Sequence, residues 1–294
     1  MSKHSRLFIF VVSLLLVLTA FSFLAGARRL ATFSVRDLFS VRKRVREGRA
    51  YQNEILKKCS FYIAPAPIAH AFMSIGQVDS SKIIDLTYGL PAHALRQTND
   101  HPKRARSETL IIGFFGGSQR RKGLQVLIDA FCCIPENYPA KLWISTSSPN
   151  VQWVFRYVHE RSTAFSFVKD GRISVFLNEK DDRYFARMRE VDLAVIPTLY
   201  YECTPLVLLE VLAQGTPCIV SEGPGMNHIV NPGVSGASFP PNNPEALRAL
   251  LVEIINDPAR LEIWRKNLYR PFSMDEYARR LEPILRDLAT GKNA

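Results

Sequence analysis

The sequence predicts an α/β protein in which residues 107–294 form a doubly wound parallel sheet. Short apolar segments alternate regularly with amphipathic segments through this region, as expected for repeated strand–helix units. A glycine-rich basic turn directly after the first apolar segment is typical of the junction between a strand and the helix that follows it. Hydrophobic residues make up 47% of the 294 residues, which is enough for a substantial core.

An uncharged apolar run lies near the start of the chain. Leu7–Leu24 has the length needed to cross a hydrocarbon core. Two Lys or Arg precede this run and eight follow within about 25 residues, so we expect residues 1–27 to form a single-pass membrane anchor with the remainder facing the cytoplasm. Two alternatives stay open: a cleaved signal peptide, because Ala25–Ala27 resembles a cleavage site, and a buried remnant of a folded domain.

The net charge of +11 is concentrated in the same part of the chain. Residues 1–49 carry +8, which leaves +3 for the other 245 residues. This distribution, without a basic-aromatic RNA motif or finger spacing, argues against a nucleic-acid partner and suits anionic membrane headgroups. The five cysteines are odd in number and show no metal-ligand spacing, so we expect reduced packing residues.

The predicted elements follow one another in a simple order. Residues 28–106 give weak signals: a basic helical stretch over Val41–Lys58, a strand at Phe61–Ala64, a helix near Ile68–Ile75 and a linker at residues 99–103. The later strands are expected at Thr109–Gly116, Lys141–Thr146, Ile173–Leu177, Leu193–Thr198, Pro217–Ser221 and Ala237–Pro240. The helices between and after them are expected at Leu124–Cys133, Val151–Arg161, Asp182–Arg189, Pro205–Ala213, Met226–Val230 and Pro244–Ile255.

In a sheet of this kind ligands bind at the carboxyl ends of the strands, so functional residues should follow Gly116, Thr198 and Ser221. The turn from Gly116 and Gly117 through Arg121 and Lys122 is flexible and basic, and it suits a pyrophosphate. A solvated surface turn is the alternative reading of this stretch.

The second informative stretch surrounds the helix expected at Pro205–Ala213. Thr204 suits an N-cap, and Pro205 suits the first helical position. Glu210 lies among apolar residues, so we expect a buried carboxylate that needs partners. A ribose diol is a suitable partner, with Glu202 facing the hydroxyls of a donor sugar, whereas pairing of Glu210 with a structural arginine stays open.

These stretches resemble retaining glycosyltransferase family 4, also called glycosyl transferases group one. The family signature is Glu, seven residues, Glu, here Glu202 and Glu210. Further matches are the stretch from Gly116 through LQVLIDAF, the run LLEVLAQGTPCIVSE and the run NPGVSGASFPPNNPEALRALL. Residues 82–91, KIIDLTYGLP, look like the strand and turn that end the N-terminal domain of the family.

The resemblance implies a GT-B fold and metal-independent sugar transfer from a nucleotide sugar with retention of anomeric configuration. By motif position, Lys122 neutralises the leaving diphosphate, Glu210 holds the ribose and Glu202 holds the donor hexose. The donor site then consists of Gly116, Gly117, Arg121, Lys122, Thr204, Leu206, Val207 and Glu210, with Glu202 and Lys122 as the catalytic pair.

Four departures from the family pattern qualify this reading. Gly117 stands where the family usually places an arginine, so one positive charge for the phosphates is missing unless Arg120 or Arg121 reaches over. Pro205 has no amide hydrogen, whereas the glycine that is more common there supplies a backbone donor, although Leu206 and Val207 can still donate. His228 stands where the family often has glutamate, and we expect it to be structural. The segment 28–106 is shorter than the family's acceptor-binding domain, which makes it an incomplete N-terminal domain.

The sequence thus predicts a membrane-tethered retaining glycosyltransferase, with an incomplete N-terminal domain and a complete Rossmann-like domain at residues 107–294. Its acceptor is an unknown sugar or lipid, in cell-envelope polysaccharide or glycolipid synthesis, and a second chain could supply the acceptor domain. The first alternative is a non-catalytic module that binds a nucleotide sugar or a partner. A nicotinamide oxidoreductase is less consistent, because the first turn lacks the spaced glycine fingerprint.

Overall fold

The computed structural model describes residues 58–76, 78–95, 109–147, 151–164, 171–179 and 181–290, and isolated positions between 43 and 55. The chain forms two compact units, Met1–Cys59 and Ser60–Ala294, and the account below concerns the second. The apolar run Leu7–Leu24 lies outside the described residues. Within the described ranges, no helix is both long enough and apolar enough to span a membrane.

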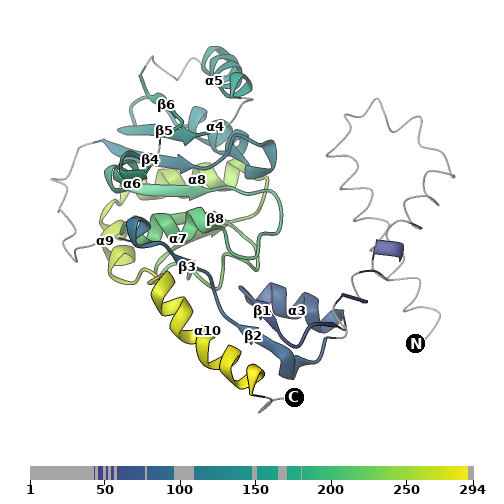
Figure 1. The fold of residues 1–294 in the computed structure, drawn as a ribbon. Coiled ribbons are helices and arrows are strands. Elements are labelled where there is room, and N and C mark those ends of the chain that lie inside the picture. Colours follow the sequence, from purple (N-terminus) through teal and green to yellow (C-terminus); the bar gives the residue numbers. More distant parts are fainter. Residues whose placement is uncertain are drawn as a thin grey trace. The chain divides into compact units, whose positions relative to one another are not determined.

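The centre of the second unit is a six-stranded sheet in which every neighbouring pair is parallel (Figure 1). Its strands are β4 (Leu110–Phe115), β5 (Ala140–Thr146), β6 (Ile173–Leu177), β7 (Leu193–Ile196), β8 (Cys218–Ser221) and β9 (Gly236–Phe239). Their order is β6-β5-β4-β7-β8-β9, so the chain builds outward from β4 in one direction and then from β7 in the other. This confirms the predicted α/β fold, and it places a topological switch point between β4 and β7.

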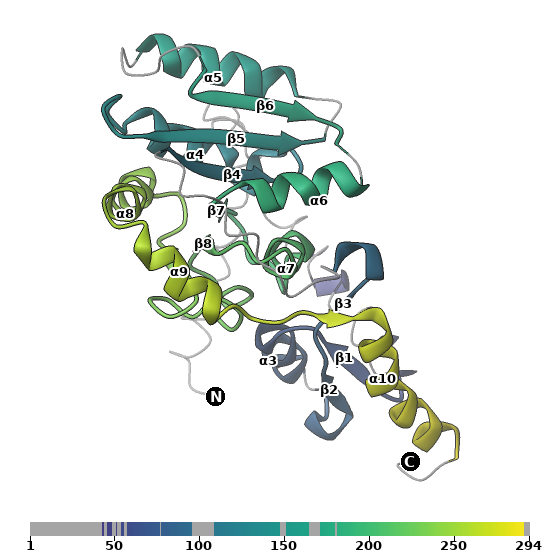
Figure 2. The ribbon, with the colours of Figure 1, turned by 90° about the vertical axis from the view of Figure 1, so that its left-hand side faces the viewer.

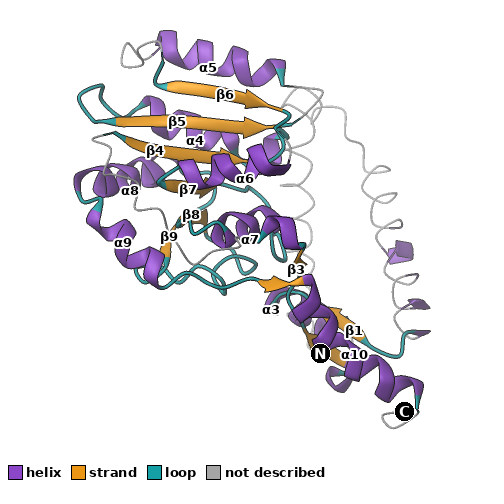
Figure 3. Ribbon diagram, turned by 60° about the vertical axis from the view of Figure 1, so that its left-hand side comes forward, coloured by secondary structure: helices purple, strands orange, loops and turns teal. Residues whose placement is uncertain are grey.

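Helices cover both faces of the sheet (Figure 3). They are α4 (Leu124–Cys132), α5 (Gln152–Ala164), α6 (Asp181–Glu190), α7 (Leu206–Ala213), α8 (Pro244–Asn256) and α9 (Ala259–Lys266). The core cluster on one face takes residues from α4, α5, α8 and α9, and the cluster on the other face takes residues from α6 and α7.

The strand β4 shows why the sheet is buried on both faces. Ile112 and Phe114 contribute to the cluster beneath α4 and α8, whereas Ile111 and Phe115 contribute to the cluster beneath α6 and α7. Successive side chains of a strand point to opposite faces, and a sheet covered by helices on both sides therefore needs a continuous apolar run. The sequence LIIGFF meets this requirement.

The segment before the large sheet forms a small parallel unit. Strand β1 (Tyr62–Ala64), helix α3 (Pro67–Ile75) and strand β2 (Ile83–Asp85) follow one another, and β1 pairs with β2. Strand β3 (Gly89–Leu90) pairs with β10 (Phe272–Ser273), which leads directly into α10 (Met274–Ala289). Figure 2 shows α10 continuing from β10 beside β3. The C-terminal segment therefore returns to the small unit.

One predicted element does not form. The segment Met226–Val230, expected as a helix, consists of turns, while Met226 and Ile229 are buried in the core. Gly223, Pro224 and Gly225 precede it, and Asn231-Pro232 ends it, so the segment is too short and too interrupted to propagate a helix.

Candidate functional site

A cavity of about 420 Å³ opens at the carboxyl ends of β4 and β7, the switch point of the sheet. Parallel α/β sheets bind ligands at this place because the loops after the two strands diverge to opposite faces. Its described lining residues come from the position before β3, from β4 and its turn, and from the stretch between the end of β7 and the start of α7: Tyr88, Phe114, Phe115, Gly116, Gly117, Lys122, Ile196, Thr198, Glu202, Thr204, Pro205, Leu206 and Val207.

The turn after β4 is held in place by two glycines with positive φ. Gly116 has φ +139° and donates its amide to the carbonyl of Ser145, so this amide is already used within the sheet. Residues Arg120–Lys122 form a 3₁₀ turn that ends at Gly123 (φ +75°). Any side chain at Gly123 would place its Cβ 1.7 Å from the carbonyl oxygen of Pro197. The missing side chain is therefore what allows this turn to contact the loop after β7.

Further contacts join three loops at this edge of the sheet. The carbonyl of Arg121 accepts hydrogen bonds from the Leu199 amide (2.9 Å) and from Thr198 Oγ1 (3.4 Å). On the other side, a Cβ on Gly225 would lie 1.5 Å from the carbonyl oxygen of Glu202. The loops after β4, β7 and β8 thus pack in a row, with a glycine at each close contact.

This packing brings Lys122 and Glu202 together. Lys122 Nζ lies 3.1 Å from Glu202 Oε1 and 3.2 Å from Oε2, and their side chains are only 26% and 11% exposed. Burial lowers the pKa of Lys122, but its hydrogen bond with Tyr200 and its interactions with Glu202 outweigh burial and leave the pKa above its ordinary value. The ammonium group is therefore charged at neutral pH.

The two arginines of the turn each lie against an aromatic ring. The Arg120 guanidinium lies 5.4 Å from the ring centroid of Trp153, and that of Arg121 lies 5.3 Å from the ring of Tyr200. Neither is among the described lining residues, in which Lys122 is the one cationic side chain. Arg121, predicted as a donor contact, thus does not line the cavity, but its guanidinium lies over the same Tyr200 ring as the Lys122 ammonium group, which is 5.4 Å from the ring centroid.

The start of α7 differs from the prediction in one detail. Thr204 does not cap the helix: its hydroxyl donates to the carbonyls of Pro65 (3.0 Å) and Cys203 (2.8 Å), and Pro205 is the N-cap residue. The helix begins one residue later than predicted, so Thr204 precedes the N-cap position, and its hydroxyl donates to a carbonyl 139 residues earlier. The amides of Leu206 and Val207 are the first of the helix and cannot bond within it, so they are available to an anion in the cavity.

Glu210 lies one turn further along α7 on the same face as Leu206 and Val207, yet it is not among the residues that line the cavity. Burial raises the pKa of its carboxyl group, and the neighbouring His93 only partly offsets this effect. Among the described residues, no arginine forms an ion pair with Glu210. The half-buried carboxylate therefore costs stability without a structural ion pair to offset the cost.

We expect Glu210→Gln to stabilise the protein by about 0.5–1 kcal/mol at neutral pH, because the neutral amide avoids the desolvation of the carboxylate. The raised pKa of Glu210 sets the sign of the pH dependence. The carboxylate lowers the free energy of unfolding in full at pH values above that raised pKa, and this cost disappears as the pH falls toward the ordinary pKa of a glutamate. Urea unfolding at pH 7.5 and pH 4 measures this difference. A variant that is less stable at pH 7.5 would contradict this account.

Some residues of the cavity were not singled out from the sequence. Tyr88 precedes β3 and lies more than a hundred residues before Glu202, and only the topology brings the two together. Burial raises the pKa of the Tyr88 hydroxyl, with smaller contributions from Cys203 and Tyr277. The one feature of the sequence that pointed to Tyr88 was its place in the stretch KIIDLTYGLP, which resembles the end of the family's N-terminal domain. Thr198, in contrast, lies directly after a strand, where functional residues were expected.

Comparisons with known proteins agree with this fold. The family model described as glycosyl transferases group 1 matches residues 96–270. An uncharacterised glycosyltransferase of Methanocaldococcus jannaschii is 28% identical over 173 residues, which cover 58% of this chain and 43% of that protein. The chain spans less than half the length of the curated relatives it matches.

Two solved structures share the arrangement. The Anabaena protein HepE, crystallised with UDP and glucose, matches with a TM-score of 0.66 at 16% identity, over 81% of this chain and 66% of its own. A sucrose-phosphate synthase from Thermosynechococcus elongatus matches with a TM-score of 0.67 at 21% identity, over 92% of this chain and 65% of its own. Both matches extend beyond the large sheet, so they support a GT-B-like fold.

Proposed function

Because the chain belongs to the glycosyl transferases group 1 family, we propose that it transfers a sugar, with retention of anomeric configuration, from a nucleotide-sugar donor bound in the cavity between β4 and β7. The acceptor is a hydroxyl group of a sugar or lipid. The observation that carries this proposal is the half-buried ion pair of Lys122 and Glu202 at the switch point. The positive charge of Lys122 suits the diphosphate of a nucleotide sugar, and the negative charge of Glu202 suits the hydroxyl groups of its hexose.

The donor we propose is a UDP-sugar. Its diphosphate suits the Lys122 ammonium group together with the amides of Leu206 and Val207, because a helix N-terminus and a cation both favour phosphate. Its hexose hydroxyls suit the Glu202 carboxylate, which only accepts hydrogen bonds. HepE, which has the same fold, was crystallised with UDP and with glucose. Glu210, one turn along α7, is proposed to receive the ribose hydroxyls.

The proposed reaction follows from these positions. The bond between the sugar C1 and the diphosphate oxygen breaks, the bond between C1 and the acceptor oxygen forms, and the acceptor proton passes to the departing diphosphate. Negative charge grows on the diphosphate as its bond to C1 lengthens, and Lys122 stabilises that charge. The positive charge on the sugar ring is stabilised by the Glu202 carboxylate nearby.

In the free protein, Lys122 and Glu202 form an ion pair with each other. A diphosphate has to separate Lys122 from Glu202, and the hexose then takes the place of Lys122 beside the carboxylate. We expect Glu202→Gln to tighten the binding of UDP alone about threefold, because the glutamine no longer holds the ammonium group. The same variant loses a charged hydrogen bond to the sugar, so the preference for UDP-glucose over UDP is expected to fall at least about tenfold.

Calorimetric titration of the native protein and Glu202→Gln with UDP and with UDP-glucose measures both changes. Glu222→Gln is a matched control, since Glu222 is exposed in the loop after β8 and is not among the residues lining the cavity. Equal effects of Glu202→Gln on UDP and on UDP-glucose would argue against contact with the hexose.

A donor-binding module without turnover is the second candidate function. It is favoured by the lining of the cavity, in which Lys122 is the single cation among the described residues. Incubation with radiolabelled UDP-glucose and candidate sugar and lipid acceptors separates the two functions. Stoichiometric binding without product or hydrolysis would favour the module.

A further inference from the structure

The side chain of Tyr200 contacts two cations at once. The Arg121 guanidinium carbon lies 5.3 Å from the centroid of its ring, and Lys122 Nζ lies 5.4 Å from that centroid. Both cations come from the turn after β4, whereas Tyr200 belongs to the loop after β7, two residues before Glu202. Two neighbouring positive charges repel each other, and the electron-rich face and the hydroxyl of a tyrosine offset that repulsion. Tyr200 therefore holds positive charge beside the donor cavity.

Backbone contacts fix the place of this ring. The amide of Leu199, directly before Tyr200, donates a hydrogen bond to the carbonyl of Arg121 (2.9 Å). The same two loops also meet where Gly123 packs on the carbonyl of Pro197. These contacts use main-chain atoms, so they do not depend on the charges of the side chains. The ring is thus in position before a ligand binds, as a group that orients other groups requires.

Tyr200 holds the two cations by different groups. Burial alone would lower the pKa of Lys122, and the hydrogen bond from its ammonium group to the Tyr200 hydroxyl is the largest effect that raises it instead. The guanidinium of Arg121, in contrast, lies over the ring. Removing the hydroxyl should therefore affect Lys122, whereas removing the ring should affect both cations.

Donor binding changes the contacts of Lys122 but not the place of Tyr200. An ammonium group donates three hydrogen bonds, and in the free protein Lys122 directs two of them to the carboxylate oxygens of Glu202. The proposed function requires the diphosphate to separate these two side chains, and the Tyr200 hydroxyl is then the partner that Lys122 keeps. Without a fixed partner, ordering the flexible lysine side chain would cost conformational entropy at the moment of binding.

A nucleoside diphosphate carries more negative charge than one lysine can neutralise. Gly117 lines the cavity but has no side chain that could add a second positive charge. Arg121 is exposed, and its guanidinium lies over the same ring whose hydroxyl bonds to Lys122. A guanidinium group pairs with phosphate through two parallel hydrogen bonds, which makes it well suited to this charge.

We propose that Tyr200 is a positioning residue for the donor diphosphate. Its hydroxyl keeps the Lys122 ammonium group in place after Glu202 has been released to the hexose. Its ring holds the Arg121 guanidinium where that group supplies the second positive charge to the diphosphate. This inference rests on the proposed function, because it is the bound diphosphate that the two cations meet. Arg121 then acts on the donor although it does not line the cavity of the free protein.

The affinities of the full chain for UDP and for uridine, measured by calorimetry and by saturation-transfer NMR, test the role of Arg121. Arg121→Gln is expected to weaken UDP binding about fivefold to tenfold and to leave uridine binding within about twofold, because uridine has no phosphate. Arg121→Lys, which keeps the charge, should retain most of the affinity for UDP. Arg120→Gln is the matched control, since Arg120 belongs to the same turn but lies against Trp153. It should change neither affinity by more than about twofold.

Two substitutions separate the hydroxyl of Tyr200 from its ring. Tyr200→Phe is expected to weaken UDP binding about threefold, because it removes only the hydrogen bond to Lys122. Tyr200→Leu should weaken it about tenfold or more, because it releases both cations. When Tyr200→Leu is already present, Arg121→Gln should cost less than about twofold more, since the guanidinium is no longer held. Tyr201→Leu is the control, because the neighbouring Tyr201 is 72% exposed.

The comparison of UDP with uridine separates positioning from a merely structural role. Equal losses of UDP and uridine binding in the Tyr200 and Arg121 variants would overturn the inference. An effect of Arg121→Gln that is unchanged by Tyr200→Leu would also overturn it, and so would a Tyr200→Leu variant that binds UDP as tightly as Tyr200→Phe, because the ring would then hold nothing. If the native chain itself does not bind UDP, the proposed function fails instead.

Discussion

Replacing Lys122 with methionine is expected to weaken UDP binding about a hundredfold and to lower turnover of UDP-glucose about 10²–10³-fold. The change removes the one cation among the described residues that line the donor cavity, and preorganised groups facing developing charge typically contribute about 3–4 kcal/mol to the transition state. Methionine keeps most of the length and volume of the side chain. The loss is therefore expected in binding and catalysis. The unfolding midpoint is expected to fall as well, because the Glu202 carboxylate, only 11% exposed, loses its partner.

Lys266→Met is the matched control, because Lys266 is an exposed lysine in the last turn of α9. It should leave both affinity and turnover within about twofold, which also shows that a general change of net charge has no large effect. If Lys122→Met binds UDP as tightly as the native protein, the diphosphate does not lie at the switch point.

Gly123→Ala is expected to destabilise the protein by about 3 kcal/mol or more and to abolish donor binding. A left-handed conformation alone costs a non-glycine residue about 1–3 kcal/mol, and the new Cβ would in addition lie 1.7 Å from a backbone oxygen of Pro197. The turn has to move away from the loop after β7 to relieve this overlap. Such a movement separates Lys122 from Glu202 as well.

Gly233→Ala isolates the effect of conformation from that of contact. Gly233 has φ +83°, close to that of Gly123, but a Cβ there would meet nothing within 4 Å. Urea unfolding of both variants gives the two free energies. We expect Gly233→Ala to lose only about 1–2 kcal/mol and to bind UDP normally; equal losses for the two variants would mean that contact with Pro197 does not hold the turn.

The apolar pattern of the sequence was sufficient to predict the large sheet. A parallel sheet covered on both faces requires short, continuously apolar strands, and the segments that form strands β4 to β9 have that pattern. The sequence also predicted that functional residues follow β4 and β7, where the structure has a cavity. The family resemblance implied that Lys122 and Glu202 are the catalytic pair, but it assigned each to a different part of the ligand. That the two form an ion pair in the free protein depends on the contact of Gly123 with Pro197, which no local pattern shows.

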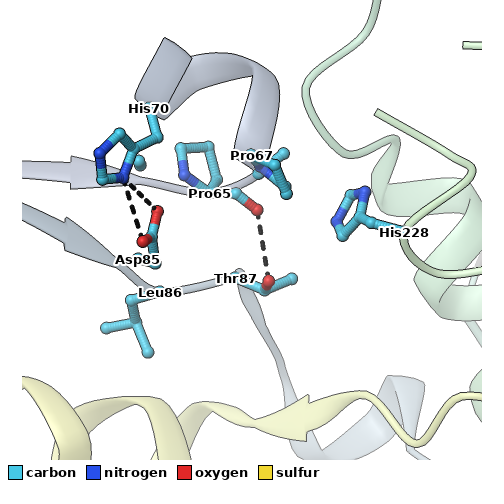
Figure 4. A pocket seen from close by; sticks show the side chains of 9 residues that line it. Pro65, Pro67, His70, Asp85, Leu86, Thr87 and His228 are labelled. Atoms are coloured by element: carbon cyan, nitrogen blue, oxygen red, sulfur yellow. Dashed lines mark hydrogen bonds and ion pairs between the residues drawn. The ribbon is translucent and has the colours of Figure 1, made fainter. Parts of the chain in front are cut away.

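Other features depended on contacts across long stretches of sequence. Thr204 has the residue type of an N-cap, yet the helix begins one residue later and the hydroxyl donates to the distant carbonyl of Pro65. His228 was expected to be structural, and in the structure it lines a cavity together with residues between 64 and 87, a neighbourhood that no local pattern shows (Figure 4). The Met226–Val230 segment was expected to be a helix, but it buries its three apolar side chains, Met226, Ile229 and Val230, while it forms turns.

Hydrogen–deuterium exchange of the full chain with and without UDP-glucose tests the central claim most directly. We expect slower exchange in two peptides, residues 114–123 and 198–209, because these carry Lys122, Glu202 and the first amides of α7. A peptide from α9 should be unaffected. Saturable binding of UDP-glucose that leaves both peptides unprotected would contradict the account, because the donor would then bind outside the switch point.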